Sequence, residues 1–160
     1  MLFRSPTCTE KDVQAANGLA AIAGIDIHTF AGEMFLAGSN VGEKSPEEIL
    51  YQDYKKFVIG KNTLCIGQVS FMSAEALENV KRILIPYLKK EIMNHQCDMT
   101  FFMLTDIINE TTELLCFGKG SETLIKEAYQ VLVTEHCCTL KGVVSRKKQL
   151  LPKLMYTLQA

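Results

Sequence analysis

Helical and strand-like patterns alternate along this chain, and the alternation restricts the fold more than any other feature. Apolar runs with a period of two, or without interruption, predict strands, and Gly60-Lys61-Asn62 between the first two runs predicts a hairpin turn. The predicted strands are Lys56–Ile59, Thr63–Phe71, Met99–Ile107, Leu114–Phe117 and Thr139–Val144.

Capping residues mark where the predicted helices begin. Thr9 and Asp12 form a variant of the capping box, and Gly24 ends the apolar face that follows them. Ser45-Pro46-Glu47-Glu48 combines a cap, a proline in the first turn and a capping-box glutamate. Three further helices are predicted. The first is capped by Asp26 and ends at the breaker that starts with Gly38, and the second is capped by Ser73, bends at Pro86 and ends at about His95. The third begins at Ser121 and ends at about Val133.

These patterns predict an α/β fold, in which a mixed sheet of about five strands is packed with helices on both faces. A hydrophobic content of 48% over 160 residues is enough to bury a sizeable core. No internal repeat or linker interrupts the pattern, so we expect residues 1–160 to form a single domain.

A cationic run, Ser145-Arg146-Lys147-Lys148-Gln149, follows the last predicted strand and precedes an apolar-periodic segment that starts at Leu150. Cations beside a helix N-terminus favour an anion, and phosphate suits both the planar fork of arginine and the mobile charge of lysine. On charge alone, a solvated face or a nucleic-acid patch is the commoner explanation of such a run.

Composition restricts those alternatives. There are 17 lysines and arginines against 18 acidic residues, so the chain as a whole does not attract nucleic acid or an anionic membrane. No apolar stretch approaches the roughly 20 residues that cross a bilayer. The segment Met1–Pro6 lacks the pattern of a secretion signal, so we expect a cytoplasmic location without membrane contact.

The six cysteines include no C-x-x-C pair, which favours buried, reduced thiols over a disulfide framework. His136-Cys137-Cys138 and His95-Gln96-Cys97 contain soft ligands, but adjacent residues on one element rarely converge on one ion. Because the chain has only three histidines, we expect no metal site built from this chain alone.

A second cation-containing loop, Phe3-Arg4-Ser5-Pro6-Thr7, precedes the first predicted helix. By residue type alone a capping loop is the better explanation, because serine and threonine before a helix are mostly caps.

Four short segments carry more information together than any one of them alone. They are Phe3-Arg4-Ser5-Pro6-Thr7-Cys8-Thr9, Ile66-Gly67-Gln68-Val69, Met103-Leu104-Thr105-Asp106-Ile107 and Gly142-Val143-Val144-Ser145-Arg146-Lys147-Lys148-Gln149. In this order, and over essentially the whole chain, they resemble the C-terminal, DHHA2-type domain of the manganese-dependent, family II inorganic pyrophosphatases of the DHH phosphoesterase superfamily.

The resemblance implies a substrate-binding role for the cationic run. Arg146 and Lys147 match the family's substrate-binding arginine and lysine, and Arg4 stands where many members have lysine. Ser145 and Gln149 are assigned to shaping the loop or to secondary substrate contacts, and Lys148 either to substrate or to solvent. The segments around Gln68 and Asp106 are interpreted mainly as sheet core, with Asp106 as a candidate for orienting the basic loop.

The resemblance also implies a division of labour between two domains. In that family an N-terminal DHH domain binds a pair of metal ions, Mn²⁺ or alternatively Co²⁺ or Mg²⁺, and the C-terminal domain binds pyrophosphate in the cleft between them. This chain contains no Asp-His-His motif, so we expect the DHH domain to be missing. The chain is then expected to contain no catalytic or metal-binding residues and to be inactive alone, although the full-length protein is an inorganic diphosphatase.

Three alternatives remain: the corresponding domain of an exopolyphosphatase or other DHH phosphoesterase, a non-catalytic anion-binding or interaction module, and, as the weakest, a nucleic-acid binder. The expected partners are pyrophosphate or phosphate and the DHH domain. Family dimers form through the N-terminal domain, so we expect this fragment to be a monomer and the full-length protein a homodimer.

Overall fold

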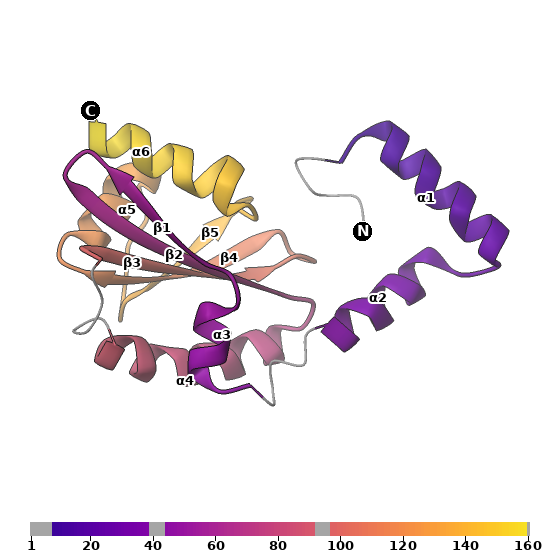
Figure 1. Ribbon diagram of the computed structural model, residues 1–160, viewed down its shortest axis with the longest axis horizontal. Coiled ribbons are helices and arrows are strands. Elements are labelled where there is room, and N and C mark those ends of the chain that lie inside the picture. The colour runs from indigo at the N-terminus through magenta and orange to yellow at the C-terminus, as the bar shows by residue number, and fades with distance from the viewer. Residues whose placement is uncertain (1–7, 39–43, 92–96, 160) are drawn as a thin grey trace. The chain divides into compact units, whose positions relative to one another are not determined.

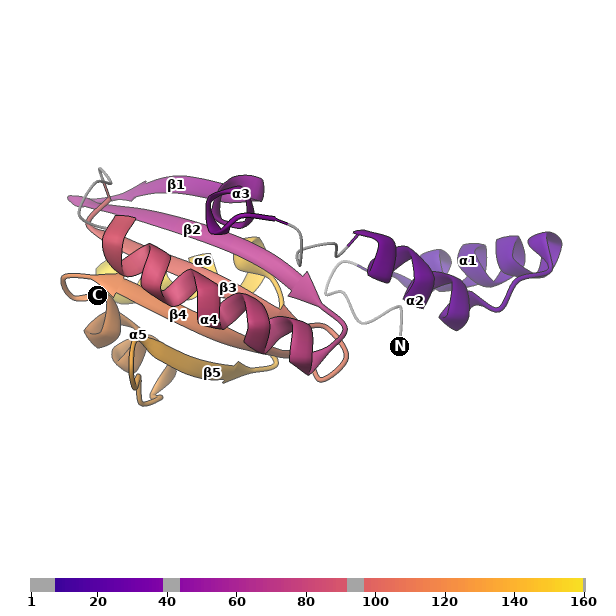
Figure 2. The same cartoon turned by 90° about the horizontal axis from the view of Figure 1, so that it is seen from below.

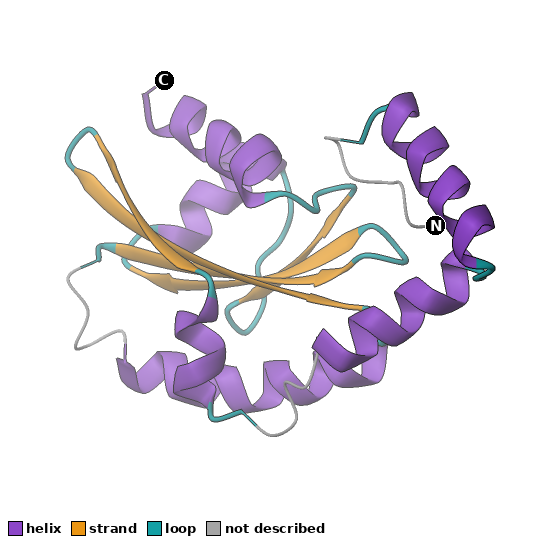
Figure 3. Cartoon of the chain, turned by 45° about the vertical axis from the view of Figure 1, so that its right-hand side comes forward, coloured by secondary structure: helices purple, strands orange, loops and turns teal. Residues whose placement is uncertain are grey.

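The computed structural model of the chain describes residues 8–38, 44–91 and 97–159 (Figure 3). The chain divides into two compact units, Met1–Asn40 and Val41–Ala160.

The first unit contains two helices whose limits follow from their caps. α1 (Glu10–Ala23) starts after Thr9, which forms a complete capping box with Asp12, and it ends at Gly24 in the left-handed conformation. α2 (Ile27–Gly38) follows, and the Asp26 carboxylate accepts the backbone N–H of Thr29 at 2.8 Å. Both predicted helices of this region are confirmed.

The second unit is built on a sheet of five strands in the order β1-β2-β3-β4-β5 (Figure 1). β1 (Tyr54–Ile59) pairs antiparallel with β2 (Asn62–Phe71), β2 pairs parallel with β3 (Met99–Asp106), and β4 (Thr111–Gly118) and β5 (Cys137–Lys141) add antiparallel neighbours. The mixed sheet predicted from the sequence is therefore confirmed.

Helices cover both faces of this sheet, as predicted. α3 (Pro46–Gln52) and α4 (Ala74–Glu91) lie on one face, whereas α5 (Ser121–Tyr129) and α6 (Leu151–Gln159) lie on the other (Figures 1 and 2). The predicted capping box of Ser45 and Glu48 is present at α3. Pro86 lies inside α4, which continues to Glu91.

The core consists of two apolar layers separated by the sheet. All eight residues of β3 are buried, and its side chains alternate between the layers because successive residues of a strand point to opposite faces. Phe101 and Met103 join the layer that includes Leu150 and Leu154, while Phe102 joins the layer under α3 and α4. The second unit is thus held together mainly by burial of apolar surface on both sides of β3.

Several predicted limits differ from the structure. β1 begins at Tyr54 rather than Lys56, and β4 spans Thr111–Gly118 rather than Leu114–Phe117. α5 ends at Tyr129 rather than near Val133, because Gln130 takes a left-handed conformation and its N–H closes on the carbonyl of Lys126. Val131 and Val133 still pack on the core from a non-helical segment, which is why the apolar pattern extended past the helix. The last strand, predicted over Thr139–Val144, spans Cys137–Lys141 and stops before Gly142, whose φ is +73°.

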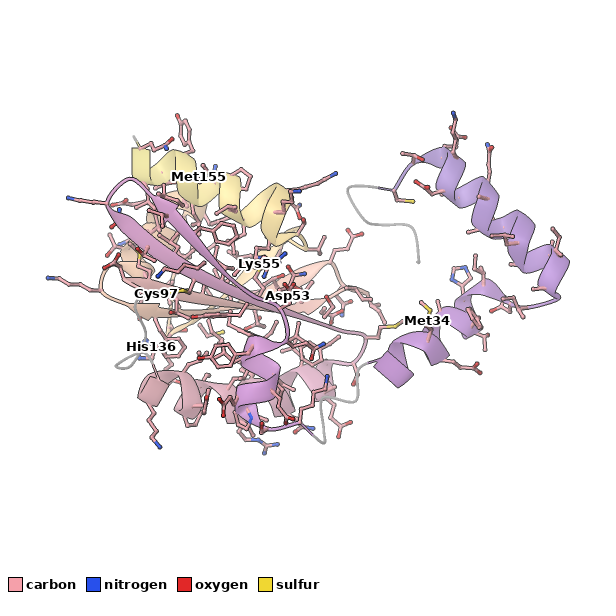
Figure 4. The ribbon with its side chains drawn as sticks, in the orientation of Figure 1. Met34, Asp53, Lys55, Cys97, His136 and Met155 are labelled. Atoms are coloured by element: carbon pink, nitrogen blue, oxygen red, sulfur yellow. A yellow bond between two sulfur atoms is a disulfide. The ribbon has the colours of Figure 1, made fainter. Side chains whose placement is uncertain are left out.

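One prediction about the cysteines is wrong. Cys65 in β2 forms a disulfide with Cys97, rather than remaining reduced, and their Cα atoms are 6.0 Å apart. Cys97 is labelled in Figure 4. Because β2 and β3 run parallel with Cys65 opposite Thr100, the residues that lead into β3 lie beside β2. Their separation of 32 residues gave no sign of this pairing.

No helix among the described residues is both long enough and apolar enough to cross a membrane.

Gly67 allows the centre of the sheet to pack closely. A Cβ atom at this position would lie 2.4 Å from two carbon atoms of the Phe102 ring and 3.2 Å from the Tyr54 ring. Phe102 is fully buried, so its ring cannot swing out to solvent. Only glycine fits at this position of β2 without displacing the aromatic ring.

We therefore expect Gly67→Ala to lower the free energy of unfolding by about 2 kcal/mol, the usual range for overpacking a core. Urea unfolding followed by circular dichroism would measure the loss. The double variant Gly67→Ala/Phe102→Leu should lose less unfolding free energy than the sum of the losses in the two single variants, because the smaller side chain at position 102 removes the clash. Unchanged stability of Gly67→Ala would contradict this account of the packing.

Candidate anion-binding site

The cationic run forms a π-helical turn, Arg146–Leu150, that leads directly into α6. Ser145 precedes the turn in an extended conformation, and its Oγ accepts the backbone N–H of Lys148 at 3.2 Å. The backbone N–H groups of Gln149 and Leu150 both point to the carbonyl of Ser145. The turn therefore has its own capping residue and a defined backbone.

Gln149 closes this loop with its side-chain amide. Its Oε1 accepts the N–H groups of Val144 and Ser145, each at 2.9 Å, and its Nε2 donates to the carbonyl of Gly142 at 2.6 Å. Ser145 and Gln149 thus shape the turn, and a substrate contact by either side chain stays a prediction.

Arg146 points inward, and its side chain is only 8% exposed. Its Nη1 donates to the carbonyls of Asp53 at 2.8 Å and Ile66 at 3.0 Å, and its Nη2 donates to Oδ1 of Asp53 at 2.8 Å. These bonds use three of the five N–H donors of the guanidinium group. Within the described part of the chain, the remaining donors make no hydrogen bond.

The backbone of Arg146 is held as well as its side chain. Its N–H donates to Oε1 of Gln68 at 3.3 Å, and the N–H of Gln68 in turn donates to the carbonyl of Asp53 at 3.2 Å. Asp53, Gln68 and Arg146 therefore form a closed ring of hydrogen bonds that joins the end of α3, strand β2 and the basic turn. This ring fixes the turn against the sheet although Asp53 and Arg146 are 93 residues apart.

The sequence interpretation missed Asp53 and undervalued Gln68. Gln68 is a polar residue within the otherwise apolar segment Leu64–Phe71, and that departure was the available signal. Asp53 is the C-cap residue of α3, and nothing in the sequence around it indicates a contact with Arg146.

Tyr129 supports the turn from the side of α5. Its hydroxyl donates to the carbonyl of Gln149 at 3.2 Å. Burial raises the pKa of Tyr129 to about 12, so the hydroxyl stays protonated and remains a donor at neutral pH.

Lys147 and Lys148 follow Arg146 and are exposed. Neither ammonium group makes a hydrogen bond or ion pair with the residues that the structure describes, so both charges face solvent. Arg4 lies outside the described residues, and its expected place beside this turn stays a prediction.

Asp106, the candidate for orienting the basic loop, makes its hydrogen bonds elsewhere. Its carboxylate accepts the backbone N–H groups of Ile108 and Asn109, each at 2.9 Å, and the side-chain amide of Asn109. It therefore shapes the turn between β3 and β4, and the role of orienting residue falls to Asp53.

A second polar group lies near α4 and the β4–β5 edge. Lys81 and Cys137 both contact Oε2 of Glu113, at 3.2 and 3.1 Å, beside a cavity of about 290 Å³. Burial, with Glu113 adjacent, raises the pKa of Cys137 to about 12 and keeps the thiol protonated. The cavity lacks the surplus positive charge of the basic turn, since Lys81 faces Glu113 and Glu135 also lines it.

The side chains considered as soft metal ligands point to separate partners. His136 Nδ1 lies 3.0 Å from Glu122 Oε1 and its ring stacks on Phe117, whereas Cys137 contacts Glu113. Across residues 8–38, 44–91 and 97–159, no three His, Cys, Asp or Glu side chains gather as a group that could hold a metal ion.

Comparison with known proteins places this fold and turn in a family. The sequence model of the DHHA2 domain matches residues 32–157, which include all of the sheet and the basic turn.

The relatives that match are named as pyrophosphatases. A cobalt-dependent inorganic pyrophosphatase of Clostridium perfringens is 40% identical over 96% of this chain, which corresponds to 28% of that relative. A protein of Bacillus licheniformis named as a manganese-dependent inorganic pyrophosphatase is 35% identical over 99% of this chain and 51% of its own length.

A solved structure supports the same assignment. A Methanococcus jannaschii protein titled as a family II inorganic pyrophosphatase superposes with a TM-score of 0.84 and 36% identity, over 99% of this chain and 52% of that one. This chain thus spans about half, or less, of the length of the relatives named here. With a family match over most of its length and the expected five-stranded fold, the chain belongs to the DHHA2 domain family.

Proposed function

We propose that this chain is the substrate-holding domain of an inorganic pyrophosphatase, which hydrolyses diphosphate to two phosphates. The observation that carries the proposal is the basic turn at Arg146, which is locked to the sheet and leaves lysine charges exposed. The names of relatives aligned over nearly the whole chain identify pyrophosphate as the anion to test first. The metal-bearing DHH domain is proposed as its partner.

The role of the basic turn follows from the chemistry of phosphoryl transfer. Pyrophosphate is highly charged, and its hydrolysis requires charge to be neutralised on the departing phosphate. Lys147 and Lys148 supply exposed ammonium groups, and the unused N–H donors of Arg146 supply part of a fork at a fixed position. Arg4 is proposed to add a further cation. Metal ions on the partner domain would generate the attacking hydroxide.

Fixed donors favour this role over a solvated basic face. A flexible arginine must lose side-chain freedom when it binds an anion, whereas Arg146 is already immobilised by bonds to Asp53 and Ile66. A site whose donors are placed before substrate arrives binds the charge of the transition state without reorganisation.

The proposal includes a cytoplasmic location, a monomeric state for this fragment and a homodimer for the full-length protein. Sedimentation at several concentrations would test the monomer.

Isothermal titration of pyrophosphate into this chain is the first test, with phosphate and triphosphate as comparators. We expect weak binding that falls by about tenfold or more in Lys147→Ala, because one charge-assisted hydrogen bond is lost. Lys126→Ala, which removes an exposed lysine on α5, is the matched control and should leave the affinity unchanged. Equal binding by all three proteins would exclude the basic turn as the anion site. Preference for triphosphate would favour a polyphosphatase.

Arg146→Ala should affect stability as well as binding. The substitution removes three hydrogen bonds, to the carbonyls of Asp53 and Ile66 and to the Asp53 carboxylate, so we expect a loss of about 3 kcal/mol in urea unfolding. Lys147→Ala should change the unfolding free energy by less than about 0.5 kcal/mol, as is usual for exposed positions. Arg146→Lys keeps the charge but cannot span both carbonyls and the carboxylate, so it should recover only part of the loss. A fully stable Arg146→Ala protein would contradict the structural part of this role.

The chain alone should release no phosphate from pyrophosphate, with or without Mn²⁺, because the residues that activate water are proposed to lie on the DHH domain. Supplying that domain from a relative, separately or fused, should produce Mn²⁺-dependent phosphate release that a colorimetric assay detects. Turnover by the chain alone would show that the proposed division of labour is wrong.

A further inference from the structure

Lys55 lies beside the carboxylate that holds Arg146. Its Nζ is 4.0 Å from Oδ1 of Asp53, the same oxygen that accepts Nη2 of Arg146 at 2.8 Å (Figure 4). The two cations therefore approach one oxygen atom from different elements, Lys55 from β1 and Arg146 from the basic turn.

The alternation of β1 places Lys55 on the same face of the sheet as that turn. Phe57, two residues further along, packs on the apolar layer that contains Leu150 and Leu154, whereas Tyr54 packs on the opposite layer. Because residues two apart in a strand share a face, Lys55 lies on the side of Phe57 and Lys56 on the side of Tyr54.

The charge of Lys55 is available to a ligand. Its side chain is 62% exposed, and 4.0 Å exceeds the length of an N–H···O hydrogen bond. Asp53 is already neutralised by Arg146 at 2.8 Å, so its carboxylate and the guanidinium together carry little net charge. The group of Arg146, Asp53 and Lys55 therefore carries one net positive charge, and Lys55 is its exposed cation.

We propose that Lys55 is a further substrate-binding residue, which donates to a phosphoryl group of pyrophosphate bound at the basic turn. This inference rests on the proposed function. Pyrophosphate has two phosphoryl groups, so cations from two elements can bind it at both ends, and Lys55 supplies charge that does not come from the cationic run itself. Asp53 positions the site by holding Arg146 on one side of Lys55.

The structure provides a matched control for this proposal. Lys56 is the next residue of the same strand, is also exposed, and lies on the opposite face of the sheet. Lys55→Gln and Lys56→Gln therefore remove the same charge from the same strand, and only the first removes it from the face of the basic turn.

Isothermal titration of pyrophosphate into the full chain and these variants tests the proposal. We expect Lys55→Gln to weaken binding by about tenfold, as for the loss of one charge-assisted hydrogen bond. Lys56→Gln should change the affinity by less than about twofold, because its charge is screened and remote. Lys55→Arg, which keeps the charge, should restore most of the affinity. Thermal unfolding of each variant establishes that the exposed substitutions leave the fold intact.

The outcomes separate this inference from the proposed function. If Lys147→Ala weakens binding but Lys55→Gln does not, or if Lys55→Gln and Lys56→Gln weaken it equally, the role of Lys55 is overturned and the proposed function stands. If the unaltered chain binds no pyrophosphate, both are overturned.

Discussion

The buried guanidinium of Arg146 is the constraint on which the candidate site depends. A cation taken out of water must be compensated by acceptors, and this one finds two carbonyls and a carboxylate on elements far away in sequence. These acceptors lie close together where β1 pairs with β2, since Ile66 lies opposite Lys55 and Asp53 directly precedes β1. The position of the basic turn is therefore set by these two strands and not by the turn alone.

This arrangement separates two tasks that a cationic motif can perform. Arg146 donates three side-chain hydrogen bonds to other residues of the protein, and its positive charge is paired with the carboxylate of Asp53. The lysines that follow it are exposed and make no pair with described residues. One cation thus works as a structural anchor, and its neighbours keep the mobile, strongly hydrated charge that suits exchange of an anion with water. The three adjacent cations look alike in the sequence, but Arg146 is buried and Lys147 and Lys148 are exposed, so they differ in what they can contact.

The sequence predicts the fold well because its signals are local. The capping boxes at Thr9 and Ser45, the hairpin near Gly60 and the buried run of β3 each depend on neighbouring residues. The basic motif was also visible as a run.

What the sequence did not predict depends on contacts between distant residues. Nothing in the spacing of Asp53 and Arg146, or of Cys65 and Cys97, indicates that they meet. The end of α5 was misplaced for a related reason: Val131 and Val133 remain apolar because they pack on the core, whether or not they are helical. The spacing of apolar residues indicates which side chains are buried, and it indicates the backbone conformation only indirectly.

The place of β1 in the sheet has a consequence for solubility. β1 is an outer strand in the order of the sheet, and no other strand of the described residues pairs with its outer edge. That edge therefore presents backbone donors and acceptors, and the side chain of Val58 in β1 is 73% exposed. Such edges invite strands of other molecules to add to the sheet, and lysines on the edge strand oppose that addition because they would be desolvated by it. Lys55 and Lys56 occupy this strand. The charge that we propose for binding a small anion at this edge also makes the edge a poor place for a second β-strand.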